Sequence, residues 1–274
     1  KWNLICNKPL TDTITKAKLR IEYDLLGYKS IARSTFIVKE PERAKHIIAR
    51  YNKNLAIFRQ KYMDLAETKL PMYKNVLTEG YCGPGCYKTY IDGSKTATPW
   101  NEDVSNRAIL SELKSVIHES THRLNYTSIG WWRKQVKILV YPDSIFTIDP
   151  SASINSSLLK DEMMKHPFTK NVFRFKSYIN TDKNMGSTIN GVFGLLDEFS
   201  AYFHGTNAAY LMLQELEASG DSIMAEEMKT ECLKTYYAYY EFNAFIGCYL
   251  YYIKNNEPDI YTETMNNESL RIAY

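Results

Sequence analysis

The chain has 274 residues, of which 45% are hydrophobic and 24% are charged, and its formal net charge is only +3. This composition is typical of a soluble globular protein with a sizeable core, and so small a charge gives no indication of nucleic-acid binding. The nearest approach to a membrane span, the apolar run 244–253, falls well short of the roughly 20 residues that a spanning helix needs, so we expect no membrane span.

The chain starts at Lys1 rather than at a methionine, which we interpret as loss of a signal segment from a secreted, periplasmic or cell-surface protein; a cytoplasmic location stays open. Five cysteines do not settle the compartment. Cys82 and Cys86 flank a Gly-Pro-Gly turn and could form a disulfide, whereas the other three show no readable pairing. The 22 tyrosines predict aromatic packing between helices, with a sticky binding groove as the alternative.

Residues 1–97 predict an N-terminal helical region with a strand at its edge. Apolar residues at helical spacing predict a helix over 11–26, followed by a short strand over 35–38 and a long amphipathic helix over 41–68.

Alternating residues over 87–91 predict the edge strand. An edge strand offers unpaired N–H and C=O groups, so an extended peptide could pair with it. An ordinary hairpin closed by the two neighbouring cysteines explains the same pattern equally well.

The helix predicted over 98–125 carries the first chemical motif, His-Glu-Ser-Thr-His at 118–122. Apolar residues before the motif recur at the three-and-four spacing of a buried face. Two histidines four residues apart point the same way on a helix, so His118 and His122 can bind one metal ion. Glu119 projects about 100° round from His118, which places its carboxylate beside the open position of the ion, where a general base belongs.

The middle of the chain is less regular. We expect a strand over 136–141 and, from the Ser- and Asn-rich stretch 150–161, a loop between lobes. A short helix over 158–165 ends at His166, which could donate a hydrogen bond to a transition state, although a histidine before a proline is more often a simple terminus residue. The aromatic segment 171–180 has no clear pattern.

A second helix, predicted over 188–204, carries Glu198. Catalytic zinc usually takes three protein ligands and leaves the fourth place for water, so Glu198 is the natural third ligand beside the two histidines. Asp197 and Tyr202 could support the metal-bound imidazoles through hydrogen bonds. His204 lies about 120° off the Glu198 face, which makes it a poor ligand on a regular helix. Small residues on the Glu198 face would let two helices approach closely; they are Gly194, Ala201 and Gly205.

Helices over 208–216 and 222–254 and a polar tail are expected to complete the chain. Residues 98–274 are then a catalytic core with a helical C-terminal lobe, or the whole chain is one continuous domain.

The two motifs together resemble those of the gluzincins, zinc metallopeptidases that are thermolysin-like in the broad sense, with His-Glu-x-x-His on one helix and a ligand glutamate on a later one. The resemblance rests on 118–122 and Glu198 and covers roughly 100–206. It implies an α+β, predominantly helical, zincin-like catalytic domain with a small sheet, one zinc ion per chain, Glu119 as general base, and a peptide or protein substrate. The thermolysin-like pattern often has an aspartate four residues after the ligand glutamate, where this chain has Tyr202.

Two other interpretations stay open. A metallopeptidase-like scaffold could bind partners without catalysis, although a purely structural site would need no base and would normally close with a fourth ligand. The motif could also have arisen by chance in a helical binding protein, with both histidines hydrogen-bonded in the core.

Overall fold

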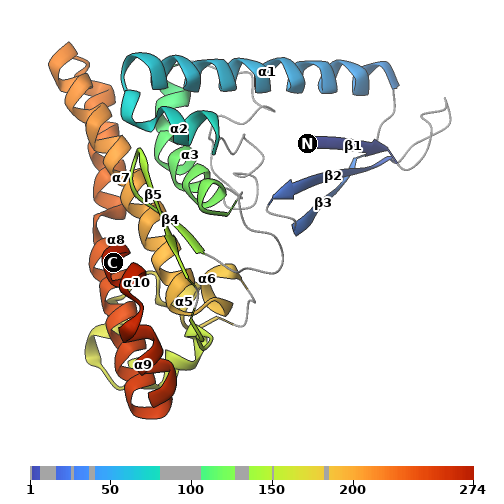
Figure 1. Ribbon diagram of the computed structural model, residues 1–274. Helices are drawn as coiled ribbons and strands as arrows, with labels where there is room; N and C mark the ends of the chain where they lie inside the picture. The colour runs from blue at the N-terminus through green and yellow to red at the C-terminus, as the bar shows by residue number, and fades with distance from the viewer. Residues whose placement is uncertain are drawn as a thin grey trace.

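The computed structural model describes residues 2–6, 17–25, 28–36, 41–80, 106–126, 136–149, 151–181 and 185–274. Helices dominate these residues, and the strands form two small antiparallel sheets (Figure 1). The predominantly helical composition expected from the sequence is therefore confirmed. Within the same residues, no helix is both long enough and apolar enough to cross a membrane.

The N-terminal sheet consists of β1 (Trp2–Cys6), β2 (Ala17–Leu25) and β3 (Tyr28–Phe36), paired antiparallel in that order. The helix predicted over 11–26 is wrong, because its described part is β2. Apolar and charged residues alternate along the whole of β2, and this period of two outweighs the looser helical spacing. β3 supplies a partner along all nine residues. Of the strand expected over 35–38, residues 35 and 36 end this longer strand, and 37 and 38 lie outside the described residues.

Three helices follow, the first two joined by a short 3₁₀ turn: α1 (Pro41–Thr68), η1 (Pro71–Tyr73), α2 (Lys74–Thr78) and α3 (Asn106–Tyr126). α1 has the predicted bounds. Its buried residues Phe58, Tyr62 and Ala66 recur every four positions, so one face of the helix lies in the core. α3 ends one residue beyond the predicted helix; the expected start, 98–105, lies outside the described residues.

The second sheet is a hairpin of β4 (Val136–Tyr141) and β5 (Ser144–Ile148). β4 is the strand predicted at those residues. β5 was not expected, and it pairs with β4 across a two-residue turn at Pro142 and Asp143. The pairing register shifts between Leu139 and Tyr141.

Short helices connect the hairpin to the C-terminal helices: η3 (Ser156–Leu159), α4 (Lys160–Met164), η4 (Pro167–Asn171), α5 (Phe175–Tyr178) and α6 (Gly186–Ile189). The helix predicted over 158–165 corresponds to η3 and α4. The segment 171–180, which had no clear pattern, contains α5.

Four helices complete the chain: α7 (Val192–Ser219), α8 (Ser222–Asn256), α9 (Pro258–Asn266) and α10 (Glu268–Ala273). The predicted helices 188–204 and 208–216 are in fact joined in α7. Gly191, with φ of 56°, separates α7 from α6. The C-terminal residues, expected to be a polar tail, instead form α9 and α10, because Asn267 caps α10 through the backbone N–H of Leu270, whose side chain is buried.

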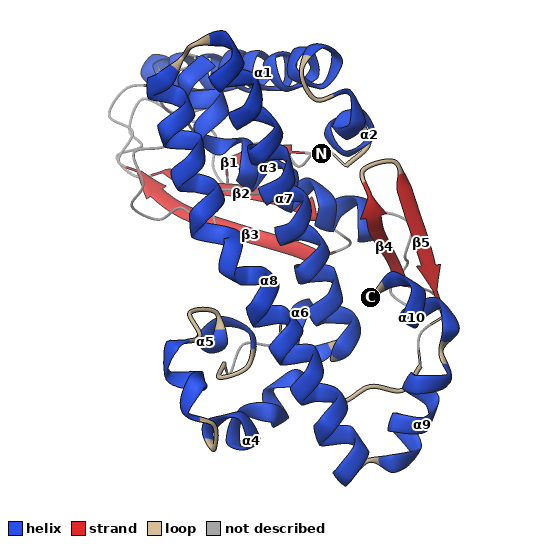
Figure 2. Ribbon diagram, turned by 90° about the vertical axis from the view of Figure 1, so that its left-hand side faces the viewer, coloured by secondary structure: helices blue, strands red, loops and turns tan. Residues whose placement is uncertain are grey.

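α7 and α8 each contribute buried residues to both apolar clusters. From Ala208 onwards α7 packs with α1, α2 and α3, whereas its first turns pack with β4, β5 and α8. It therefore lies beside both α3 and α8 (Figure 2). α3 also contacts α8 directly, so α7 and α8 together hold α3 in place.

Gly205 allows α7 to approach α3 closely. A Cβ atom at this position would lie 2.7 Å from the carbonyl oxygen of Lys114 and 3.4 Å from the Cβ of His118. A larger residue would therefore push the two helices apart beside His118.

We predict that Gly205→Ala lowers the free energy of unfolding by about 1–3 kcal/mol, because the added methyl group overpacks a contact with backbone. Gly247→Ala is the matched control, since a Cβ there meets nothing within 4 Å. Alanine is the better helix former, so this control should raise the free energy of unfolding by about 0.5–1 kcal/mol. Chemical denaturation followed by circular dichroism measures both, and equal effects would contradict a close contact at Gly205.

Candidate metal centre

A cleft of about 1110 Å³ opens among α3, α7, α8, the segment 168–181 and Met185. Two helices line it with the candidate functional residues: His118, Glu119 and His122 from α3, and Glu198 from α7. A concave site that gathers titratable side chains from separate elements is the usual setting for binding or catalysis.

His118, His122 and Glu198 form a group that can hold a metal ion, and within the described residues no other group of His, Cys, Asp or Glu converges in this way. The two Nε2 atoms lie 3.2 Å apart, and Oε2 of Glu198 lies 3.8 Å from Nε2 of His118 and 3.4 Å from that of His122. Ligands of tetrahedral zinc, at bond lengths of about 2.0–2.1 Å, stand roughly 3.3 Å apart. The donor set and its spacing therefore fit zinc.

A chain of hydrogen bonds holds His122 in the orientation that a metal ligand needs. Nδ1 of His122 lies 2.8 Å from Oδ2 of Asp197, whose Oδ1 accepts from Nδ2 of Asn125 at 2.7 Å. The Asn125 side-chain oxygen in turn accepts from the backbone N–H of Leu139 at 2.8 Å. Because Nδ1 faces the carboxylate, Nε2 faces His118 and Glu198.

The two histidines differ in their electrostatic surroundings. Burial and the neighbouring charge of His122 hold the pKa of His118 well below its usual value. Burial also acts to lower the pKa of His122, but the Asp197 and Glu198 carboxylates outweigh it and raise that pKa well above its usual value. A divalent ion binding here would therefore compete with a proton on His122.

Two tyrosines support Glu198 and His118. The Tyr178 hydroxyl donates to Oε2 of Glu198 at 3.0 Å and lies 3.2 Å from the Tyr202 hydroxyl. The Tyr202 ring packs edge-on against the His118 ring, with centroids 4.5 Å apart. Burial, followed by the charge of Glu198, raises the pKa of Tyr178 well above its usual value, so this phenol stays a hydrogen-bond donor.

Glu119 lines the same cleft but is not one of the three converging residues. Burial raises its pKa to about 7; the charge of His122 opposes this rise, and the charges of Glu198 and Asp197 add to it. Glu119 therefore lies in the same cleft as His118, His122 and Glu198 but is not one of the three candidate ligands.

Arg174 and Glu241 form a buried ion pair that lines the cleft, with Nη1 2.6 Å from Oε2. The other Glu241 oxygen accepts from the backbone N–H of Phe173 at 2.6 Å. The Arg174 guanidinium also lies over the Tyr202 ring, 4.4 Å from its centroid. Sequence reasoning missed this pair, along with Tyr178 and Asn125. Only Asn125 had a signal, since it lies one turn beyond His122 on the histidine face of α3.

The other two candidate histidines lie apart from the group. His204 is fully buried; its Nε2 lies 2.9 Å from the carbonyl oxygen of Leu139 and its Nδ1 lies 3.3 Å from the Tyr73 hydroxyl. Asn207 donates to that hydroxyl, so the Tyr73 hydrogen is free to point at Nδ1. His166 is exposed and stacks on Phe168. The residues of the predicted strand 87–91, with Cys82 and Cys86, lie outside the described residues.

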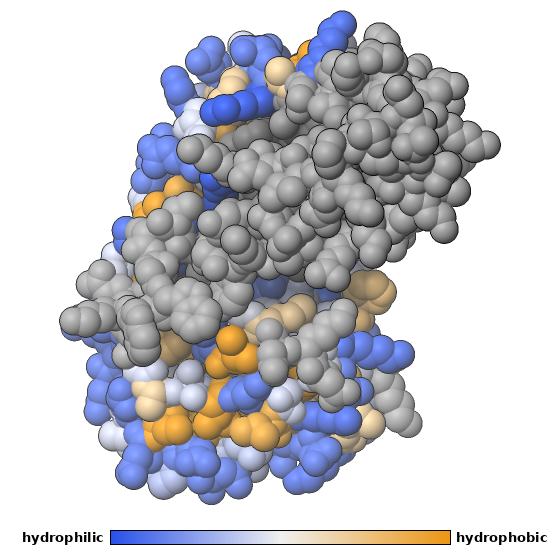
Figure 3. Space-filling model, turned by 90° about the vertical axis from the view of Figure 1, so that its right-hand side faces the viewer, coloured by the Kyte–Doolittle hydropathy of each residue, from blue (hydrophilic) through white to orange (hydrophobic). Residues whose placement is uncertain are grey.

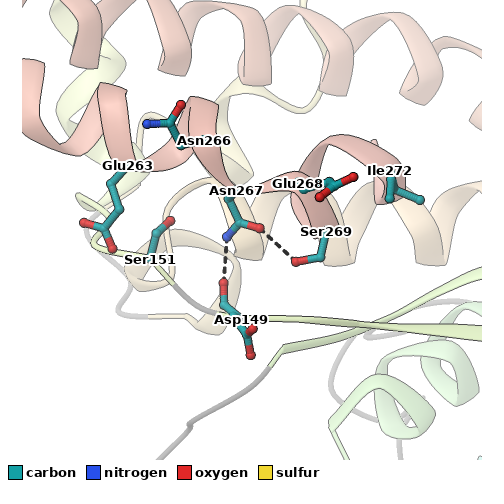
Figure 4. A pocket seen from close by; sticks show the side chains of 8 residues that line it. All are labelled: Asp149, Ser151, Glu263, Asn266, Asn267, Glu268, Ser269 and Ile272. Carbon is teal, nitrogen blue, oxygen red and sulfur yellow. Dashed lines mark hydrogen bonds between the residues drawn. The ribbon is translucent and has the colours of Figure 1, made fainter.

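A second cavity, of about 700 Å³, lies between β5 and the C-terminal helices (Figure 4). Its acidic residues Asp149, Glu263 and Glu268 do not converge as the cleft group does. The side-chain amide of Asn267 donates to the backbone carbonyl of Asp149 and accepts from the hydroxyl of Ser269, so both of its polar ends are bonded within the cavity lining. This cavity therefore lacks the donor geometry of the cleft.

Comparisons of the chain with protein-family models, with curated proteins and with solved structures found no match. The function of the site is therefore inferred from its own geometry.

We predict that His204 makes stability depend on pH, because burial lowers its pKa to about 4 in the folded state. The unfolded state, with a pKa near 6.5, takes up a proton first as the pH falls. The stabilisation from neutral His204 is therefore complete above pH 6.5, declines between pH 6.5 and 4, and amounts to on the order of 3 kcal/mol.

Urea unfolding of the wild type and His204→Gln at pH 7, 5.5 and 4, both with chelator, measures this dependence. The cost of the substitution should shrink as the pH falls. His166→Gln, at an exposed position, is the control and should cost little at any pH. A cost of His204→Gln that is the same at pH 7 and pH 4 would contradict the assignment.

Proposed function

We propose that the protein is a zinc-dependent hydrolase of peptide bonds. The observation that carries the proposal is the spacing of three ligand atoms from two helices, with the further carboxylate of Glu119 in the same open cleft. Three protein ligands with one open position are typical of catalytic zinc, whereas structural zinc usually has four. The peptide as substrate, and a zincin-like fold, come from the resemblance of the two motifs to the gluzincins.

When bound, zinc supplies a Lewis acid that polarises a carbonyl and lowers the pKa of a water molecule to about 7. Glu119 is the general base in this proposal: its carboxylate takes the proton from the attacking water and returns it to the leaving amine. Tyr202 lines the cleft with its ring against His118, and in this proposal its hydroxyl turns from Tyr178 to donate to the oxygen that becomes negative as the carbonyl is attacked. His204 cannot take that role, because its ring is bonded within the core.

Asp197 and Asn125 orient the His122 ring in this proposal. They hold the His122 ring so that Nε2 faces the position where the ion binds. Asp197 also compensates part of the positive charge that zinc and the imidazoles bring. Both residues are buried, so water does not compete for these hydrogen bonds.

The proposed function predicts that each chain binds one zinc ion. His118→Ala, His122→Ala and Glu198→Ala should each lose zinc, because two remaining protein ligands hold the ion poorly. His166→Ala is the control, since this exposed histidine lies outside the group. Elemental analysis of protein purified without added metal measures the ratio. Full zinc content in Glu198→Ala would remove Glu198 from the ligand set.

The second prediction separates binding from catalysis. Glu119→Gln keeps the shape of the side chain but removes the proton acceptor, so we expect unchanged zinc content and a rate of peptide cleavage lower by about 10²–10⁴-fold. Glu215→Gln, on an exposed part of α7, is the matched control and should cleave at the wild-type rate.

The assay is cleavage of a mixed peptide library, with chelator-treated protein as the blank. Full activity in Glu119→Gln would contradict the assigned base. If zinc-loaded wild type cleaves no peptide in the library, the proposed function is wrong and the site binds metal without this chemistry.

A further inference from the structure

Helix α8 has two apolar faces. One face is buried in the core through Ala238, Phe242, Phe245 and Tyr249. The second face lines the cleft through Leu233, Tyr237 and Tyr240, which lie four and three residues apart and are 60%, 66% and 54% exposed. A helix that packs once on a core needs only one apolar face, so the second face indicates a second partner.

A different segment presents aromatic side chains to the same cleft. Phe168 and Phe173 line it, and Phe173 is 83% exposed. Large apolar side chains also reach the surface elsewhere, as the lower half of the face in Figure 3 shows, so exposure by itself singles out nothing. The cleft residues differ because two separate segments direct them to one cavity that also holds the candidate metal centre.

The backbone of the exposed Phe173 is also held in place. Its backbone N–H donates to Glu241, and Glu241 is fixed by the buried guanidinium of the next residue, Arg174. The same guanidinium lies over Tyr202, which packs on His118. One buried ion pair thus fixes the backbone of an exposed phenylalanine relative to the candidate metal-binding group. A large apolar side chain on a fixed backbone suits binding, because no backbone entropy is lost when a ligand covers it.

We propose that this cleft selects polypeptide segments with a large apolar or aromatic side chain, which is held between Phe173 and the stripe of Leu233, Tyr237 and Tyr240 on α8. The inference rests on the proposed function for the peptide nature of the ligand. It adds the class of residue that determines specificity and the side chains that recognise it.

The test uses two fluorescent peptides that are identical except for a central Phe or Ser. Binding is measured by fluorescence anisotropy on chelator-treated protein, so it requires neither metal nor turnover. We expect the Phe peptide to bind about tenfold more tightly than the Ser peptide. Tyr237→Ser and Phe173→Ser should each remove most of this preference. Tyr251→Ser is the matched control, because Tyr251 lies on the same helix and is 58% exposed but does not line the cleft.

Cleavage of the same peptides by zinc-loaded protein is the second readout, and the two Ser variants should raise KM for the Phe peptide with little change in kcat. Equal binding of the two peptides, or a preference that survives when Tyr237→Ser and Phe173→Ser are combined in one chain, would overturn the inference. Cleavage without any preference for Phe would overturn it and leave the proposed function standing. Binding that prefers Phe, without cleavage, would support the inference about the cleft and overturn the proposed function.

Discussion

The backbone of Leu139 in β4 makes hydrogen bonds to both helices that carry the candidate metal ligands. Its N–H donates to Asn125 of α3, while its carbonyl oxygen accepts from Ser200 at 2.6 Å and lies 2.9 Å from Nε2 of His204, both on α7. The backbone N–H and C=O of one residue thus tie the hairpin to both helices. Buried hydrogen bonds are costly to leave unmade, so α3 and α7 cannot shift independently without breaking one of these contacts.

The geometry of the ligand group follows from this arrangement. Asn125 also holds Asp197, and Asp197 holds His122, so the contact at Leu139 continues into the metal-binding group. Asp197 and Glu198 are consecutive residues, about 100° apart round α7. One carboxylate can therefore orient a histidine while its neighbour serves as a ligand. The close approach at Gly205 brings the helices near enough for His118 and Glu198 to meet.

The local parts of this site could be predicted from the sequence, whereas the long-range parts could not. Helical spacing predicts that His118 and His122 share a face, and small residues beside Glu198 predict a close helix contact. The same reasoning placed a helix over 11–26, where strict alternation in β2 decides for a strand. The pair Arg174–Glu241 joins residues 67 positions apart, and no local pattern connects them. Tyr178 was hidden in an aromatic segment of no clear period, because only tertiary packing directs its hydroxyl to Glu198.

The fold also brings several acidic side chains together at the candidate metal centre. α3 and α7 bring Glu119, Asp197 and Glu198 together in a largely buried region, where carboxylates are costly unless a proton neutralises them or a positive charge compensates them. Against the effect of burial, the Asp197 and Glu198 carboxylates raise the pKa of His122, so they favour a protonated, positively charged imidazole at this place. A divalent ion bound there would replace the proton and supply more positive charge. Because only the folded chain brings these side chains together, a metal ion bound here would stabilise the contact between α3 and α7 by mass action, and any disturbance of that contact would weaken its binding in return.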